Sequence, residues 1–186
     1  MVSASMNTAS VSEGYDLFLT PLDGEYVAEI ATPAGAAMVE GLATREATAA
    51  DRDRVVALWH DCGLTRPWND PVADFDRAVD GPTSAVLVRE TAGDVVASAM
   101  VGYDGHRGWV YYVSVDPNHR GGGHGAGIMA AAEDWLRALG APKLQLMVRA
   151  DNGVAAGFYE AIGYEPGQSQ FFATWLQPNA AADPPQ

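Results

Sequence analysis

Apolar and polar residues follow two different periodicities between residues 41 and 164, and these periodicities predict the elements of the fold. Apolar positions recur at helical spacing in residues 48–62, and Asp70-Pro71 is a favourable start for a second helix. The pattern further predicts strands at 42–45, 85–90, 95–103, 109–115 and 143–149, helices at 123–139 and 152–162, and a final turn and strand within 163–176.

The order of these elements indicates the fold class. A run of hairpin strands followed by alternating helices and strands is typical of a mixed sheet with helices on both faces. We therefore predict an α/β fold with a mixed, mostly antiparallel twisted sheet of six to seven strands, flanked by about four helices.

The two ends of the chain differ from this central part. The first dozen residues are small and polar, and we expect a mobile tail there. Residues 15–20 and 25–31 are expected to form a hairpin, followed by a linker at 32–37. We predict an N-terminal extension (1–40), one main domain (41–177) and a disordered tail (178–186). The extension is expected to be either an accessory structure or an interface element.

Composition narrows the class of protein. The 186 residues are 48% hydrophobic and carry a formal charge of −13, with Lys143 as the only lysine. Such an acidic surface repels nucleic acid and favours cationic ligands. A single cysteine, Cys62, allows no intrachain disulfide and fits a reducing compartment. No apolar run reaches the ~20 residues of a membrane span, and the N-terminus lacks a secretory pattern. We expect a cytoplasmic protein without membrane contact.

The most informative motif lies in residues 113–127, where an apolar strand ends at a proline turn and a glycine-rich loop enters a helix. Such a loop leaves backbone N–H groups unpaired at a helix N-terminus, where the helix dipole also favours negative charge. Four glycines within 121–125 cost backbone entropy that a simple turn does not require. The motif therefore predicts a binding site for a pyrophosphate.

Two common nucleotide-binding patterns do not fit this loop. There is no Gly-Lys-Ser/Thr, so it is not the P-loop of nucleoside triphosphatases. The dinucleotide pattern Gly-x-Gly-x-x-Gly also fails, because Ala126 and Ile128 stand where its last glycine is required. What remains is Arg120-x-x-Gly123-x-Gly125 between a strand and a helix.

This motif resembles motif A of the GNAT family of acyl-CoA-dependent N-acetyltransferases. The following helix is similar to that family's next motif, since Asn152, Ala155 and Tyr159 match Asn-x-x-Ala-x-x-x-Tyr and Gly163-Tyr164 follows. The resemblance covers residues 41–176. Within the family, residues 66–71 and 102–108 resemble a group of small bacterial acetyltransferases whose acceptor the resemblance does not define.

The resemblance implies acetyl-CoA as co-substrate, without a metal. In this family the sheet splays between the fourth and fifth core strands, here 109–115 and 143–149, and the pantetheine arm lies in that gap. A backbone N–H at about Val113 would polarise the thioester carbonyl. The implied cofactor contacts are Val113, Ser114, Val115, Arg120, Gly121, Gly122, Gly123, His124, Gly125, Asn152 and Tyr159. Asn152 has a second interpretation as a helix cap.

The resemblance also suggests residues for the chemistry. Tyr159 is the candidate general acid for the departing thiolate, because a phenol of pKa ~10 is protonated at neutral pH. The attacking amine must lose a proton, and Asp104, His106 or a water chain is the candidate base. The candidate acceptor-binding residues are Arg66, Trp68, Asn69, Tyr103 and Tyr111. Trp68 has the alternative role of core beneath its loop.

The function expected from these observations is transfer of an acetyl group from acetyl-CoA to a primary amine, either a small amine or a protein N-terminus. Direct attack in a ternary complex requires no covalent enzyme intermediate. The histidines show no metal-ligand spacing with Cys62, so no metal is expected. The alternatives are a non-catalytic acyl-CoA-binding module or an interaction domain on the same fold. A monomer and a homodimer are both compatible with the sequence.

Overall fold

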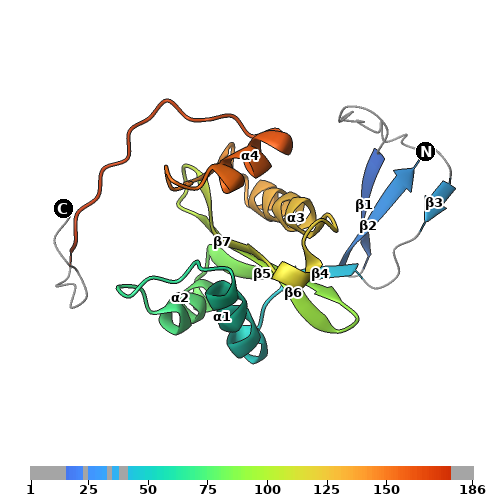
Figure 1. The fold of residues 1–186 in the computed structure, drawn as a ribbon, viewed down its shortest axis with the longest axis horizontal. Helices are drawn as coiled ribbons and strands as arrows, with labels where there is room; N and C mark the ends of the chain where they lie inside the picture. Colours follow the sequence, from blue (N-terminus) through green and yellow to red (C-terminus); the bar gives the residue numbers. More distant parts are fainter. Residues whose placement is uncertain (1–15, 23–24, 33–34, 38–41, 177–186) are drawn as a thin grey trace.

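A mixed sheet separates two pairs of helices in the computed structural model, which describes residues 16–22, 25–32, 35–37 and 42–176 (Figure 1). The strands are β1 (Asp16–Leu22), β2 (Glu25–Thr32), β3 (Gly35–Ala37), β4 (Leu42–Glu46), β5 (Ser84–Thr91), β6 (Asp94–Tyr103), β7 (Gly108–Val115) and β8 (Leu144–Leu146). The helices are α1 (Arg52–Asp61), α2 (Pro71–Asp80), α3 (His124–Ala138) and α4 (Gly153–Ala161). Helices α1 and α2 lie on one face of the sheet, and α3 and α4 lie on the other.

The strands of this sheet lie in the order β1-β2-β4-β5-β6-β7-β8, and β3 pairs with β2 beside that path. Every pairing is antiparallel except that of β7 with β8. The predicted α/β fold with a mixed, mostly antiparallel sheet is thus confirmed. The described residues form eight strands rather than six to seven.

The additional strands come from the N-terminal region. β1 and β2 form the predicted hairpin, and β2 pairs with β4 through Tyr26–Thr44 and Val27–Ala43. The expected linker at 32–37 is in part wrong, because Gly35–Ala37 forms β3. The extension therefore continues the sheet of the main domain. The expected tails at residues 1–12 and 178–186 lie outside the described residues.

Each face of the central strands has its own core. Along β5, Val86 and Val88 pack with Trp59 of α1 and Phe75 of α2. The alternate residues of β5 pack against α3, whose buried Ile128, Ala132 and Leu136 recur every fourth residue. This is the helical periodicity that the sequence shows.

The starts of the helices follow local sequence signals. Asp70 caps α2 as predicted, with Oδ1 accepting the backbone N–H of Val72 at 3.0 Å and of Ala73 at 3.1 Å. The helix predicted from residue 48 begins with a 3₁₀ turn, Ala49–Asp51, and α1 itself starts at Arg52. The carboxylate of Asp51 accepts the N–H of Thr48 at 2.7 Å, which completes a capping box.

Two expectations for the C-terminal part are wrong. The strand predicted over 143–149 is confined to Leu144–Leu146, and no strand forms in residues 163–176. That last segment runs away from the rest of the domain in Figure 1, and its Phe171 and Phe172 are exposed. Residues of high strand propensity form a strand only where a paired edge supplies backbone partners, and propensity alone does not reveal such an edge.

Candidate active site

The two parallel strands, β7 and the edge strand β8, separate part of the way along the sheet. β7 pairs with β8 only through Gly108–Val110, opposite Leu144–Leu146, although β7 continues to Val115. Among the described residues, no strand therefore pairs with residues 111–115 on the β8 side. This is the gap that the sequence resemblance implied between the fourth and fifth core strands.

A bulge lies within this open part of β7. Tyr112 has a φ of 50°, and the pairing of β6 with β7 changes register between Ser98 and Met100. A bulge of this kind leaves a residue outside the ladder and redirects the backbone, and such bulges are frequent beside active sites. Tyr112 and Val113 therefore have backbone groups outside the regular ladder. No glycine or turn signal in the sequence marks this position.

Side chains hold the bulge in place. The ring of Tyr112 stacks on Trp59, with centroids 4.1 Å apart and an interplanar angle of 15°. Its hydroxyl donates to Asp74 Oδ2 at 2.8 Å and accepts a hydrogen bond from Asn69 Nδ2 at 3.3 Å. Burial is the main cause that raises the pKa of Tyr112 to about 12, and the hydrogen bond to Asp74 adds to it. The bulge is thus packed against α1 and hydrogen-bonded to α2 and the α1–α2 loop.

The side chains next to the bulge contribute to the core. Ser114 is buried, and its hydroxyl lies 2.8 Å from that of Ser98, which in turn accepts the N–H of Trp59 at 3.0 Å. Val113 and Val115 pack on the α3 side. A ligand contact at the buried Ser114 would therefore have to come from its main chain, and we expect the same for Val113 and Val115.

The glycine loop joins the end of β7 to the start of α3. Asp116 begins this connection: Oδ1 accepts the N–H of Asn118 at 2.9 Å, and Oδ2 accepts a hydrogen bond from Arg54 at 2.8 Å. Gly121 and Gly123 have φ values of 78° and 75°, which other residues adopt only with strain. Gly123 is the N-cap of α3 and has no side chain to bind the first N–H groups of that helix. Among the described residues, no backbone carbonyl accepts a hydrogen bond from the N–H groups of Gly121–Gly125, so the loop and helix offer the donors that the sequence leads us to expect.

The helix α4 contacts the first turn of α3. A Cβ on Gly125 would lie 3.1 Å from the ring of Phe158, so a side chain there would press on α4. The Phe158 ring centroid lies 5.0 Å from that of Tyr159, which lies 5.9 Å from that of Tyr164. This contact brings the two sequence motifs together.

Tyr159 is the predicted acid on α4. Its side chain is partly buried, and burial raises the pKa of Tyr159 to about 12. Burial is the only cause of this shift, and no hydrogen bond to the hydroxyl from another of the described residues contributes to it. The phenol is therefore protonated at neutral pH and able to donate to a ligand. Asn152 caps the same helix, with Oδ1 accepting the N–H of Ala155 at 3.1 Å, which supports the capping interpretation of that residue.

The two candidate bases lie in the turn between β6 and β7, at the end of β7 that is paired with β8. Asp104 Oδ1 accepts the backbone N–H groups of Arg107 at 2.6 Å and of His106 at 2.7 Å, and Oδ2 accepts from Trp109 Nε1 at 3.0 Å. These hydrogen bonds, that from Arg107 first, lower the pKa of Asp104 to about 2. Such a carboxylate is a weak base and an effective anchor of its turn. His106 is exposed beside it.

The predicted acceptor-binding residues divide between the two faces of the sheet. Asn69 is joined to the bulge through Tyr112, and Trp68, beside it, is 45% exposed, so it is not core beneath its loop. Tyr111 is 41% exposed, with its ring stacked on that of Trp109. Tyr103 packs on the α3 side and does not share this face.

Arg66 stabilises the α1–α2 loop. Its Nη1 donates to the carbonyl of Thr65 at 2.7 Å and to that of Gly63 at 2.8 Å.

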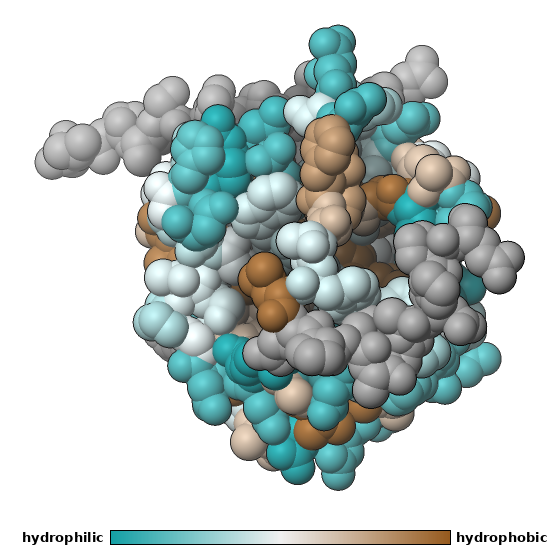
Figure 2. Space-filling view, turned by 90° about the vertical axis from the view of Figure 1, so that its left-hand side faces the viewer, coloured by the Kyte–Doolittle hydropathy of each residue, from teal (hydrophilic) through white to brown (hydrophobic). Residues whose placement is uncertain are grey.

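Figure 2 shows one face of the molecule, on which apolar side chains form separate patches among hydrophilic ones, beside a hollow.

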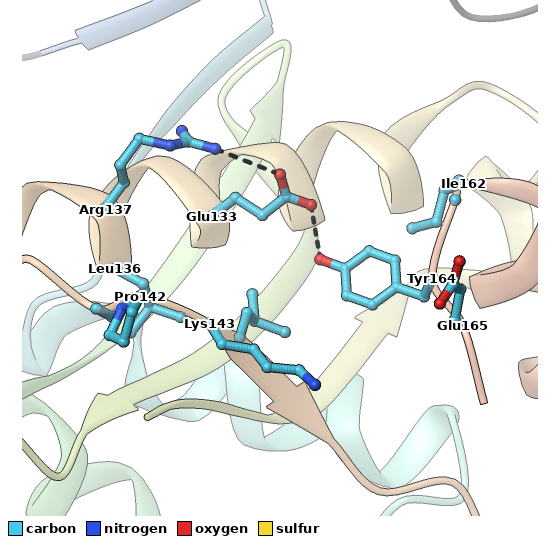
Figure 3. A pocket seen from close by; sticks show the side chains of 11 residues that line it. Glu133, Leu136, Arg137, Pro142, Lys143, Ile162, Tyr164 and Glu165 are labelled. Carbon is cyan, nitrogen blue, oxygen red and sulfur yellow. Dashed lines mark hydrogen bonds and ion pairs between the residues drawn. The ribbon is translucent and has the colours of Figure 1, made fainter. Parts of the chain in front are cut away.

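A cavity of about 580 Å³ lies away from the glycine loop, at the last turns of α3 (Figure 3). There Tyr164 donates to Glu133 at 2.7 Å, and Arg137 lies 3.7 Å from the same carboxylate. Its lining includes Lys143 and none of the predicted site residues. The cavity is at the opposite end of α3 from the glycine loop, and we assign it no part in the site.

The part of the chain that the structure describes contains no group of three or more histidine, cysteine, aspartate or glutamate side chains placed to hold a metal ion. Among its helices, none combines the length and the apolar character required to cross a membrane.

Comparisons with known proteins agree with this geometry. Residues 40–164 match the model of the acetyltransferase (GNAT) family. The chain is 46% identical to acetyltransferase SG1711 of Sodalis glossinidius over 115 residues, which are 62% of this chain and 81% of that protein. It is 45% identical to acetyltransferase YE1169 of Yersinia enterocolitica over the same length, covering 62% and 82%.

Solved structures share the architecture. The aminoglycoside N-acetyltransferase AAC(6')-Iy in complex with CoA superposes with a TM-score of 0.64 at 16% identity, over 79% of this chain and 100% of that one. Glucosamine-6-phosphate N-acetyltransferase from Arabidopsis thaliana gives a TM-score of 0.56 at 20% identity, over 74% and 100%. At these identities the likeness concerns the fold.

The separated strands β7 and β8, the glycine loop and the helix α4 are the features of one class of protein, the α/β acyltransferases that use an acyl-CoA. The chain belongs to the GNAT acetyltransferase family. It is an acetyltransferase that acts on an acceptor substrate.

Proposed function

We propose that this protein transfers an acetyl group from acetyl-CoA to a primary amine by direct attack in a ternary complex. The observation that carries the proposal is the open edge of β7 beyond Val110, which ends directly at a loop of unpaired N–H groups. An extended chain with a diphosphate at one end fits such an arrangement. Acetyl-CoA is the member of the acyl-CoA class that the family's name suggests.

The cofactor is held at two places. The amides of Gly121–Gly125 and the exposed Arg120 bind the diphosphate, because unpaired N–H groups at a helix N-terminus favour anions. The pantetheine arm lies along Val113–Val115 and hydrogen-bonds to the strand backbone. The N–H at Val113, beside the bulge, polarises the thioester carbonyl and stabilises the developing oxyanion.

The chemistry needs a proton at the sulfur and the loss of one from the amine. Tyr159 donates to the departing thiolate, since its raised pKa keeps the phenol protonated. For the amine, the pKa of about 2 makes Asp104 a poor proton acceptor, and both Asp104 and His106 lie at the paired end of β7, away from Val113. A water chain is the alternative to both.

The acceptor enters on the α1–α2 side of the sheet. Trp68, Asn69 and Tyr111 lie on that side, with Asn69 bonded to the bulge residue Tyr112. The formal charge of −13 favours a cationic acceptor such as a small amine, a polyamine or a protein N-terminus. Residues 66–71 and 102–108 support a relationship with the small bacterial acetyltransferase YpeA and its relatives. We place it in the cytoplasm, as a monomer or homodimer.

A transfer assay tests this function. The protein is incubated with acetyl-CoA and a panel of primary amines, polyamines and peptides, and the release of free thiol is followed. We expect turnover with at least one cationic acceptor and none with acetyl-CoA alone. Binding of acetyl-CoA without turnover on any acceptor would favour a non-catalytic acyl-CoA-binding module instead.

A further inference from the structure

A buried arginine lies beneath the first turn of α3, beside the glycine loop. Arg89 is on β5 and is only 6% exposed. It pairs in register with Ala97 of β6, which pairs with Val115 of β7, so Arg89 lies at the end of the sheet where β7 stops and the loop begins. A Cβ on Gly127 would lie 2.0 Å from Nη1 of Arg89. A glycine at 127 therefore leaves the room that the guanidinium occupies.

The charge of Arg89 has no counter-ion within the described part of the chain. None of the hydrogen bonds or ion pairs among those residues involves it, and its Nε is buried without any partner. Burial lowers the pKa of Arg89, but a guanidinium remains protonated in proteins. Burying an unpaired charge is strongly unfavourable. Such a charge next to an anion-binding loop points to an anion that arrives with the ligand.

His124 connects this arginine to the loop. It is the first residue of α3, 8% exposed, and its Nδ1 also has no hydrogen-bond partner. Its ring lies beneath the loop, because a Cβ on Gly122 would be 3.1 Å from the ring atom Cδ2. Burial lowers the pKa of His124, and the charges of Arg89 and His119 add to this. The imidazole is therefore neutral at neutral pH, and Arg89 is the permanent charge of this group.

We propose that Arg89 is a positioning residue whose buried charge draws the phosphates of the acyl-CoA onto the glycine loop, acting through the first turn of α3. The inference rests on the proposed function, because it requires the acyl-CoA phosphates at this loop. A charge with little water around it acts more strongly than one at the surface. It also matters more in a chain of formal charge −13, whose overall field repels anions.

The test compares three ligands and three variants. Arg89→Met removes the charge and keeps a long side chain, Arg89→Lys keeps the charge, and Arg137→Met is the matched control with the same charge change at the other end of α3. Isothermal titration calorimetry measures the dissociation constants of acetyl-CoA, 3′-dephospho-acetyl-CoA and S-acetylpantetheine. We expect Arg89→Met to raise the dissociation constant of acetyl-CoA about tenfold. Arg89→Lys should lose less affinity than Arg89→Met, and Arg137→Met should bind acetyl-CoA like the parent protein.

S-acetylpantetheine has no phosphate, so all three variants should bind it as the parent protein does. If Arg89→Met loses as much affinity for 3′-dephospho-acetyl-CoA as for acetyl-CoA, the effect of Arg89 is assigned to the diphosphate. A smaller loss of affinity for the dephospho ligand assigns part of the effect to the 3′-phosphate. An unchanged affinity of Arg89→Met for acetyl-CoA would overturn the proposal. An equal loss for S-acetylpantetheine would also overturn it, because Arg89 would then support the shape of the site and not its charge.

Folding of the variants is measured separately by thermal unfolding without ligand. Removing an unpaired buried charge should leave the melting temperature of Arg89→Met at or above that of the parent protein. If Arg89→Met does not fold, Arg89→Gln with Arg89→Lys provides the same comparison of charges. If the parent protein itself fails to bind acetyl-CoA, the proposed function is wrong, and that result is distinct from a failure confined to Arg89.

Discussion

The helices α3 and α4 carry the two halves of the proposed site, and they are built differently. α3 buries five residues (His124, Ile128, Met129, Ala132 and Leu136) against the sheet, whereas no residue of α4 is fully buried. The strand leading into α4, β8, has three residues, while β7 before the glycine loop has eight. The proposed phosphate site is thus part of the main core, and the proposed acid, Tyr159, lies on a loosely held helix.

This difference between α3 and α4 suggests that the two helices have different roles in cofactor binding. A loop anchored by a buried helix is in place before the ligand arrives, which lowers the free-energy cost of binding. A helix with few buried contacts opens more easily and gains order when a ligand packs against it. We expect the cofactor to dock first by its phosphates, and α4 to close on the thioester afterwards.

Core truncation should show the largest contrast between the helices. Ile128→Ala removes a fully buried side chain of α3 and should lower the free energy of unfolding by about 3 kcal/mol. Val154→Ala changes an α4 residue that is 87% exposed and should stay within about 0.5 kcal/mol. Urea unfolding measures both. Similar losses at the two positions would contradict the comparison.

Removing the proposed acid should affect turnover and not cofactor binding. Tyr159→Phe is expected to lower kcat about 100-fold, because no proton reaches the departing thiolate. Tyr164→Phe is the matched control: its ring packs beside Tyr159, but its hydroxyl is bonded to Glu133. It should keep kcat within about threefold. An unchanged kcat in Tyr159→Phe would remove Tyr159 from the mechanism.

Loss of a helix cap should have different consequences on the two faces of the sheet. Asn152→Ala and Asp70→Ala each remove an N-cap, worth about 1 kcal/mol. On α2, which buries Phe75 and Ala78, the loss should appear in global unfolding. On α4 it should appear as faster hydrogen exchange of that helix alone. Global destabilisation of equal size in both variants would show that α4 does not open independently.

The last contrast between the helices concerns high pH. Burial raises the pKa of Tyr159 from its ordinary value of 10.0 to about 12. The folded state therefore holds this proton more tightly, and the stabilisation is fully present below pH 10 and is lost as the pH rises towards 12. Hydrogen exchange and ultraviolet absorbance of tyrosinate should show α4 loosening in this range. In Tyr159→Phe the α4 loosening that depends on this proton should disappear.

The parts of the fold predicted correctly are those in which local and long-range requirements agree. Helix α3 shows its buried stripe in the sequence, and Asp70-Pro71 is a start signal that depends on neighbouring backbone alone. The glycine loop was predictable for the same reason, since left-handed backbone at Gly121 and Gly123 requires that residue type. These features need no knowledge of distant contacts.

The features missed depend on partners far away in the sequence. Arg89 would ordinarily be placed at the surface, and its burial depends on the room above Gly127. The bulge at Tyr112 is imposed by packing on Trp59 and bonding to Asp74. A strand over all of residues 143–149 was expected from propensity, but only Leu144–Leu146 finds a partner on β7.

The separation of β7 from β8 also sets a length. Residues 111–115 form the stretch between the end of the pairing and the start of the loop connection. At about 3.3 Å per residue, this open edge spans roughly 17 Å. The length of this stretch therefore fixes the distance between the proposed anion site and the point where β7 and β8 begin to pair. If the acyl-CoA binds as proposed, a shortened strand would place the acyl group at a different distance from Tyr159, and this stretch of backbone would select carriers by their length.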